Sequence, residues 1–131
     1  PAARAREYIA GYSIGLDMSC RGVEDRSFRK SADSFTVLGP YFVTADEIAD
    51  PATLELSVAV NGVIRQHSNT SLLMVGIERM VELAASVYTL YPGDVILTGT
   101  PEGVGPVVAG DVMLASCAGI GSMTIPVHAA A

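Results

Sequence analysis

Asp17 stands at the end of an apolar segment and is the residue of this chain best suited to bind a metal ion. Between Gly11 and Leu16 apolar residues alternate with small ones, which is the pattern of a half-buried β-strand. A carboxylate at the end of a strand is well placed to bind a hard divalent cation, which prefers oxygen ligands. One carboxylate does not hold Mg²⁺ alone, so the segment predicts a site whose other ligands lie elsewhere. The alternative role for Asp17 is that of a turn former or a helix cap.

The charged segment after this strand, residues 18–34, carries cations that suit an anionic ligand. Arg21 follows Asp17 by four residues, and Lys30 closes a basic cluster. The segment has little apolar periodicity, so we predict a loop, and loops often carry functional residues. The alternative is a solvated surface cluster in which Arg21 pairs with a neighbouring acid, an arrangement that contributes little stability.

The composition predicts one folded domain with no nucleic-acid or membrane partner. The chain has 131 residues, half of them hydrophobic, and a formal net charge of −6. Nucleic-acid binding needs a basic face, whereas an anionic substrate needs only a few local cations. No apolar run reaches the roughly 18 residues of a spanning helix, and no secretory signal opens the chain. Cys20 and Cys117 lie far apart, so we expect reduced thiols and a cytoplasmic protein.

Short strands are predicted around the charged segment. They cover residues 11–17 and 35–44, a hairpin over 54–66, and two further strands around 119–121. The hairpin follows from alternating apolar residues on both sides of Asn61-Gly62, which favours a type I′ turn. Gly39-Pro40 interrupts the second strand and suits an edge strand or a bulge. Residues 1–9 have the composition of a helix end.

One principal helix is predicted from Ile77 to Tyr88, where apolar residues recur with helical spacing. We expect this helix to cover a sheet and to end before Pro92-Gly93. A short buried strand over 94–98 and a Gly- and Pro-rich loop over 98–106 follow it. The fold class is therefore mainly β, mixed α+β, and the many short strands suggest a β-roll or barrel.

Four motifs carry a resemblance to a known family. They are GYSIGLDMSCRG, RKSADSFTVLGPYFVTADEI, VNGVIRQHSNTS and YPGDVILTGTPEGVGPV, in this order. Together they resemble the C-terminal catalytic domain of the fumarylacetoacetate hydrolase family, from Glu7 to Val127. The family includes acylpyruvate hydrolases, oxaloacetate decarboxylases and 2-hydroxyhepta-2,4-diene-1,7-dioate isomerases. The resemblance implies a β-roll that holds one Mg²⁺, sometimes Ca²⁺ or Mn²⁺, through three carboxylates.

By this resemblance Asp17 is the third metal ligand, and the other two come from an upstream Glu-x-Glu pair. A catalytic histidine also lies upstream in the members that hydrolyse. Neither feature is present in this sequence, whose two histidines, His67 and His128, fall outside the matching positions. The chain also starts at Pro1 without Met. We therefore expect residues 1–131 to be a single catalytic domain that lacks its N-terminal part.

Four further positions carry over from the family, and a fifth, Glu24, departs from it. Lys30 matches an active-site lysine, and Arg21 matches the arginine four residues after the metal aspartate. Gly99 and Thr100 match a pair that faces the substrate carboxylate, although a purely structural role in this Gly-rich loop is the alternative. Glu24 replaces a glutamine that contacts substrate in some relatives, which leaves the substrate open. The loop lacks the Lys-Ser/Thr of a P-loop, so we do not expect a nucleotide.

The resemblance implies a Mg²⁺-dependent enzyme of catabolism that acts on a small 2-oxo or 2,4-dioxo carboxylic acid. The reaction would proceed through a metal-bound enolate, whose charge Lys30 helps to stabilise. Hydrolysis of a carbon–carbon bond, isomerisation and decarboxylation all stay open, in aromatic or amino-acid catabolism. Family members are typically homodimers, and we expect one here. The alternative is an inactive fragment, or a degenerate binding or oligomerisation module that keeps the fold.

Overall fold

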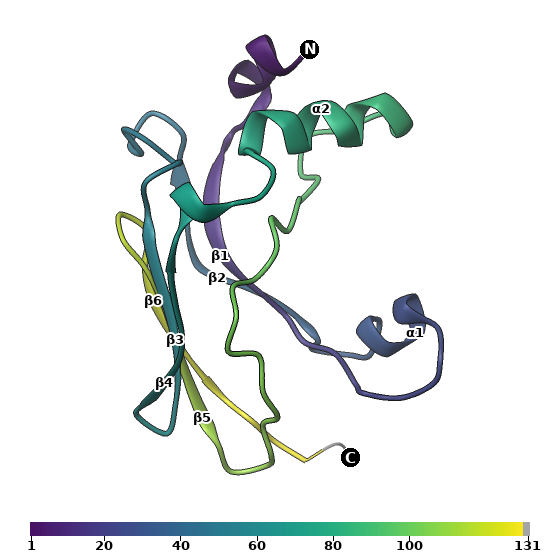
Figure 1. Ribbon diagram of the computed structural model, residues 1–131, viewed down its shortest axis with the longest axis vertical. Coiled ribbons are helices and arrows are strands. Elements are labelled where there is room, and N and C mark those ends of the chain that lie inside the picture. Colours follow the sequence, from purple (N-terminus) through teal and green to yellow (C-terminus); the bar gives the residue numbers. More distant parts are fainter. Residues whose placement is uncertain (130–131) are drawn as a thin grey trace.

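The computed structural model describes residues 1–129 and arranges them as two antiparallel sheets with four helical segments (Figure 1). In the first sheet β1 (Gly11–Asp17) pairs with β2 (Thr36–Thr44). The second sheet has the strand order β4-β3-β5-β6. Its strands are β3 (Glu55–Val60), β4 (Val63–Asn69), β5 (Val112–Cys117) and β6 (Gly121–Pro126). The predicted mainly β fold is confirmed.

The hydrophobic core joins the two sheets and follows the two-residue period of the strands. Its buried members on strands are Ile14 of β1, Val58 and Val60 of β3, Met113 and Ala115 of β5, and Met123 of β6. Successive side chains of a strand point to opposite faces. β1 therefore turns Tyr12, Ile14 and Leu16 toward the core and leaves Gly15 and Asp17 on its other face.

The predicted hairpin and the predicted bulge are both present. Asn61 and Gly62 have φ values of 50° and 79°, as a type I′ turn requires, and they connect β3 to β4. In the first sheet Tyr12 lies opposite Val43 whereas Ile14 lies opposite Gly39, so β2 carries extra residues at this point. The Gly39–Pro40 peptide bond inside this bulge is cis.

Helix α2 (Ile77–Val87) forms where it was predicted, but the expectation that it covers a sheet is wrong. It packs chiefly against η1 (Ala2–Tyr8), the 3₁₀ helix that opens the chain (Figure 1). None of its residues is buried, because η1 is too short to cover the apolar face, and Val87 stays 73% exposed. A third helical segment, η2 (Thr70–Leu72), links β4 to α2. No helix in residues 1–129 has the length and hydropathy needed to span a bilayer.

Two predictions about loops and strands are wrong. Residues 26–30, inside the predicted loop, form the short helix α1 (Arg26–Lys30), because the Asp25 carboxylate caps it by accepting the Ser27 N–H at 2.8 Å. Residues 94–98 form no ladder with any other described residue and run as an irregular segment in which Val95 is 61% exposed. An apolar run becomes a strand only when a neighbouring strand supplies hydrogen bonds, and the described chain supplies none there.

Candidate functional site

The end of β1 and the end of α1 bring two of the predicted site residues into contact. Lys30 Nζ donates a hydrogen bond to Asp17 Oδ2. Their side chains are 43% and 42% exposed, so the ion pair is open to solvent and contributes little to stability. Its importance lies in placing a carboxylate and an ammonium group together at the open end of a strand, within reach of a ligand.

Main-chain hydrogen bonds hold the segment around α1 to the end of β1. The Cys20 N–H donates to the Arg29 carbonyl at 3.0 Å, and the Met18 N–H donates to the Phe35 carbonyl at 2.9 Å. At the start of α1 the Ser27 N–H bonded to Asp25 lowers the pKa of that carboxyl. The charged segment is therefore a folded excursion that keeps Lys30 beside β1.

Arg21 and Glu24 lie together in a cavity of about 380 Å³ next to α1. Phe28 and Arg29 of α1 and the thiol-bearing Cys20 line the same cavity. Within residues 1–129 neither Arg21 nor Glu24 takes part in an ion pair. The alternative that Arg21 is tied to a neighbouring acid therefore finds no support in the described residues, and both residues line the cavity.

The segment that precedes Gly99 and Thr100 crosses the outer face of β1 at Gly15. A Cβ atom added at Gly15 would lie 2.6 Å from Leu97 Cδ2, the end of a flexible side chain, so the two segments approach closely at this position. Asp17 is two residues farther along β1 and shares this face. The loop that carries Gly99 and Thr100 therefore begins beside the face of β1 that carries the carboxylate.

Gln66 of β4 holds Thr100 in place, and the sequence analysis missed this residue. Its Nε2 donates to Thr100 Oγ1 and to the Pro101 carbonyl, both at 2.8 Å. Because the amide uses both hydrogens, Thr100 Oγ1 is an acceptor here and its own O–H is free to donate to a ligand. Thr100 thus contacts Gln66 and makes no hydrogen bond to Asp17 or Lys30. No pattern in the sequence pointed to Gln66, because its burial and its partners 34 and 35 residues away are known only from the fold.

The described residues fit a divalent ion as one part of its ligand set. Asp17 Oδ2 is bonded to Lys30, and Oδ1 accepts no hydrogen bond from the rest of residues 1–129. A carboxylate oxygen suits a hard divalent cation. However, residues 1–129 hold no group of three His, Cys, Asp or Glu side chains that could bind a metal ion. Asp17 therefore supplies one ligand, and a complete site needs others.

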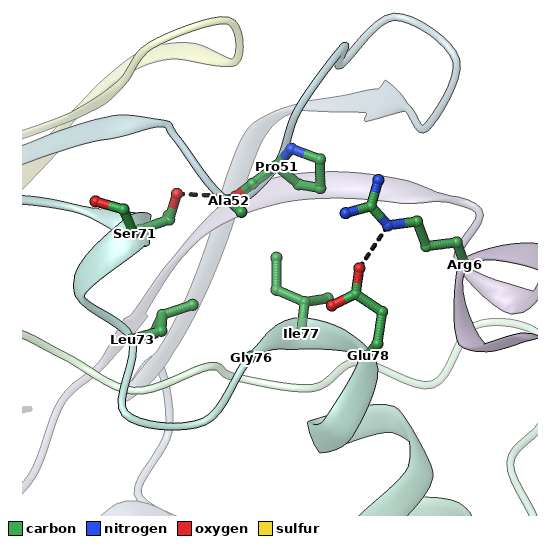
Figure 2. A pocket seen from close by; sticks show the side chains of 9 residues that line it. Arg6, Pro51, Ala52, Ser71, Leu73, Gly76, Ile77 and Glu78 are labelled. Carbon is green, nitrogen blue, oxygen red and sulfur yellow. Dashed lines mark hydrogen bonds and ion pairs between the residues drawn. The ribbon is translucent and has the colours of Figure 1, made fainter. Parts of the chain in front are cut away.

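A second cavity, of about 130 Å³, lies at the start of α2 and carries none of the predicted site residues (Figure 2). Arg6 Nε donates to Glu78 Oε1 at 2.5 Å on one side of it, and Ile77 and Leu73 form its apolar wall. The Arg6 guanidinium lowers the pKa of Glu78, and the two charges compensate each other. This cavity joins η1 to α2 and offers no free charge to a ligand.

Comparison with known proteins shows the family to which this chain belongs. Residues 1–128 match the family model described as Fumarylacetoacetate (FAA) hydrolase C-terminal, so the chain belongs to the fumarylacetoacetate hydrolase family. A maleylpyruvate hydrolase of Aquipseudomonas alcaligenes is 59% identical over 128 residues, which are 98% of this chain and 45% of that protein. A mitochondrial oxaloacetate tautomerase of Homo sapiens is 41% identical over 135 residues, 98% of this chain and 61% of that protein.

A solved structure of a relative agrees closely with the fold. The crystal structure of maleylpyruvate hydrolase from Sphingobium sp. SYK-6, in complex with manganese(II) ion and pyruvate, superposes with a TM-score of 0.93. The two chains are 44% identical, and the match covers 97% of this chain and 47% of that one. The chain thus spans about half the length of the curated relatives it matches.

Proposed function

We propose that the intact protein is a metal-dependent hydrolase of small-molecule catabolism that cleaves an acylpyruvate into pyruvate and a carboxylic acid. The observation that carries the proposal is the contact between Asp17 and Lys30 at the end of β1. It occurs in a chain that matches a maleylpyruvate hydrolase along 98% of its length. A related hydrolase structure holds manganese(II) and pyruvate, which is the product common to all acylpyruvates.

Asp17 is the residue of this chain that would hold the ion, with further ligands supplied by the rest of the protein. A bound divalent ion polarises the 2-oxo carbonyl and stabilises negative charge on its oxygen. We propose Mg²⁺ as the resident ion, because it takes oxygen ligands and is commonly held through few protein carboxylates. Mn²⁺ also suits carboxylate and carbonyl ligands and should substitute for it.

The proposed reaction assigns a task to each residue gathered here. Water adds to the acyl carbonyl, the bond between carbons 3 and 4 breaks, and its electron pair passes to carbon 3, which takes a proton to give pyruvate. The Lys30 ammonium offers positive charge to the oxygen that becomes negative as this bond breaks. The free O–H of Thr100, next to Gly99, donates to the substrate carboxylate. Arg21 and Glu24 contact the acyl part in the adjoining cavity.

The remaining features of the proposal concern the whole protein. Residues 1–131 form one catalytic domain that the rest of the chain completes with metal ligands and a base for the attacking water. The enzyme works in the cytoplasm as a homodimer, on a small 2-oxo acid substrate. Leu83 and Val87 of α2 are exposed apolar side chains, which supports a partner surface on this helix.

The test is titration of the intact protein with Mn²⁺, paired with an assay for pyruvate release. Asp17→Asn should weaken Mn²⁺ binding roughly 100-fold or more and abolish turnover, because a neutral amide is a poor ligand for a hard cation. Asp33→Asn, in the same segment and without a side-chain hydrogen bond in the structure, is the matched control and should change neither. Equal binding by both variants would remove Asp17 from the site. No binding and no turnover in the wild type would identify the inactive module instead.

A further inference from the structure

Arg29 of α1 has a buried side-chain nitrogen that the structure leaves without a partner. Its Nε is the one buried side-chain nitrogen or oxygen atom in residues 1–129 that makes no hydrogen bond. Leaving a buried donor unsatisfied is unfavourable, and native structures rarely do so without a ligand, ion or water to complete the bond. Arg29 also lines the 380 Å³ cavity, so an acceptor for its guanidinium group can lie there.

The backbone of Arg29 is fixed on both sides. Its N–H donates to the Asp25 carbonyl at 3.1 Å, and its carbonyl accepts the Cys20 N–H at 3.0 Å. Lys30, the next residue, contacts Asp17, whereas Arg29 lines the cavity. One turn of α1 thus presents two cations in two directions. Lys30 lies at the proposed keto-acid site beside Asp17, and Arg29 lies at the adjoining cavity.

The cavity has an excess of positive charge. Arg21 and Arg29 both line it, against the single carboxylate of Glu24, and neither guanidinium forms an ion pair within the described chain. A guanidinium matches a carboxylate through two parallel hydrogen bonds, which makes arginine selective for that group. The ring of Phe28 and the methyl group of Ala32 supply apolar surface for the carbon chain between the two ends of a substrate.

We propose that Arg29 binds the terminal carboxylate of a dicarboxylic acylpyruvate and so selects substrates whose acyl group ends in a negative charge. This inference rests on the proposed function, because it takes the Asp17–Lys30 end of the site to hold the pyruvate part. It makes Arg29 a specificity-determining residue for that reaction. Maleylpyruvate ends in a carboxylate and fits this class, whereas acetylpyruvate ends in a methyl group and does not.

The first experiment compares these two substrates on the intact protein. Arg29→Met should lower kcat/KM for maleylpyruvate roughly 10- to 100-fold, which corresponds to the loss of one charge-assisted hydrogen bond. The same variant should change kcat/KM for acetylpyruvate less than about 3-fold. Arg29→Lys should restore part of the loss. Arg26→Met removes the same charge from an exposed position of α1 outside the cavity and should affect neither substrate. Equal losses on both substrates, or an equal effect of Arg26→Met, would overturn the proposal.

A second experiment does not depend on turnover. Cys20 lines the cavity, so maleate should protect it from iodoacetamide, as followed by mass spectrometry of the peptide that contains it. Protection should occur in the wild type and in Arg26→Met and disappear in Arg29→Met. Maleate protection that persists in Arg29→Met, or is absent in the wild type, would overturn the role of Arg29. Failure of the wild type to cleave either acylpyruvate, with maleate protection intact, would overturn the proposed reaction and leave the carboxylate site standing.

Discussion

Replacing Gln66 with leucine should release the loop that carries Thr100. The substitution keeps the size of the side chain and removes both hydrogen bonds that Nε2 donates to Thr100 and Pro101. A neutral hydrogen bond contributes about 0.5–1.5 kcal/mol, so the pair contributes about 1–3 kcal/mol. Thr100 is exposed and can exchange its partner for water, so we expect the lower half of this range. Urea unfolding of the intact protein should show the loss at an unchanged m-value.

The same substitution should weaken substrate binding, because Gln66 leaves the Thr100 O–H free to point at a substrate carboxylate. We expect Gln66→Leu to raise KM for an acylpyruvate about 10-fold, with a smaller change in kcat. His67→Leu, at the next position of β4, is the matched control. Its imidazole contacts Glu55 at 2.7 Å in an exposed pair worth under about 1 kcal/mol, and it faces away from Thr100.

The result that would refute this reasoning is specific. If Gln66→Leu and His67→Leu lower the unfolding free energy equally and leave KM alone, the two hydrogen bonds do not position the loop. A fall in stability without a change in KM would show that Gln66 supports the fold and that Thr100 does not bind the carboxylate.

Two further predictions concern residues in turns. Gly103→Ala should destabilise the intact protein by at least about 1 kcal/mol, because φ is +94° and the new Cβ would lie 1.9 Å from the Arg65 carbonyl oxygen. Gly105→Ala, with open space around it, should be tolerated in the same thermal unfolding assay. The Val108 N–H donates to Asp111 and lowers the pKa of this carboxyl in the folded protein. The ionised carboxyl therefore stabilises the fold above its unfolded pKa of about 4, and this stabilisation is lost as pH falls through the lower pKa of the folded state. Asp111→Asn should therefore flatten the acid limb of stability against pH, and an unchanged limb would contradict the assignment.

Local patterns made much of the fold predictable from the sequence. The hairpin required only alternation and Asn61-Gly62, and β1 required only alternation up to Asp17, so neither depended on distant residues. α2 formed for the same reason, since its helical period is contained within eleven residues. Asp17 and Lys30 belong to different motifs, and their contact between β1 and α1 shows that the two motifs meet in space.

The features that escaped prediction depend on what lies across from a segment. The run from Val95 to Leu97 has strand propensity but finds no neighbouring strand among the described residues. The helical period of α2 predicts an apolar face but does not indicate whether a sheet or η1 packs against it. Gln66 owes its role to a residue 34 positions away, and Arg29 owes its role to a cavity that exists only after folding. Such contacts are invisible to a pattern that examines one stretch of chain at a time.

Strand β1 has a double duty. One face of the strand packs into the core through Ile14, and the opposite face carries Gly15 and Asp17. If the register of β1 shifted by one residue, Asp17 would turn into the hydrophobic core and Ile14 would turn to solvent. Both the carboxylate and the core contact would then be lost. The stability of the fold and the position of the proposed metal ligand therefore cannot be changed independently along β1. Repacking the core around Ile14 would therefore also move the Asp17 carboxylate.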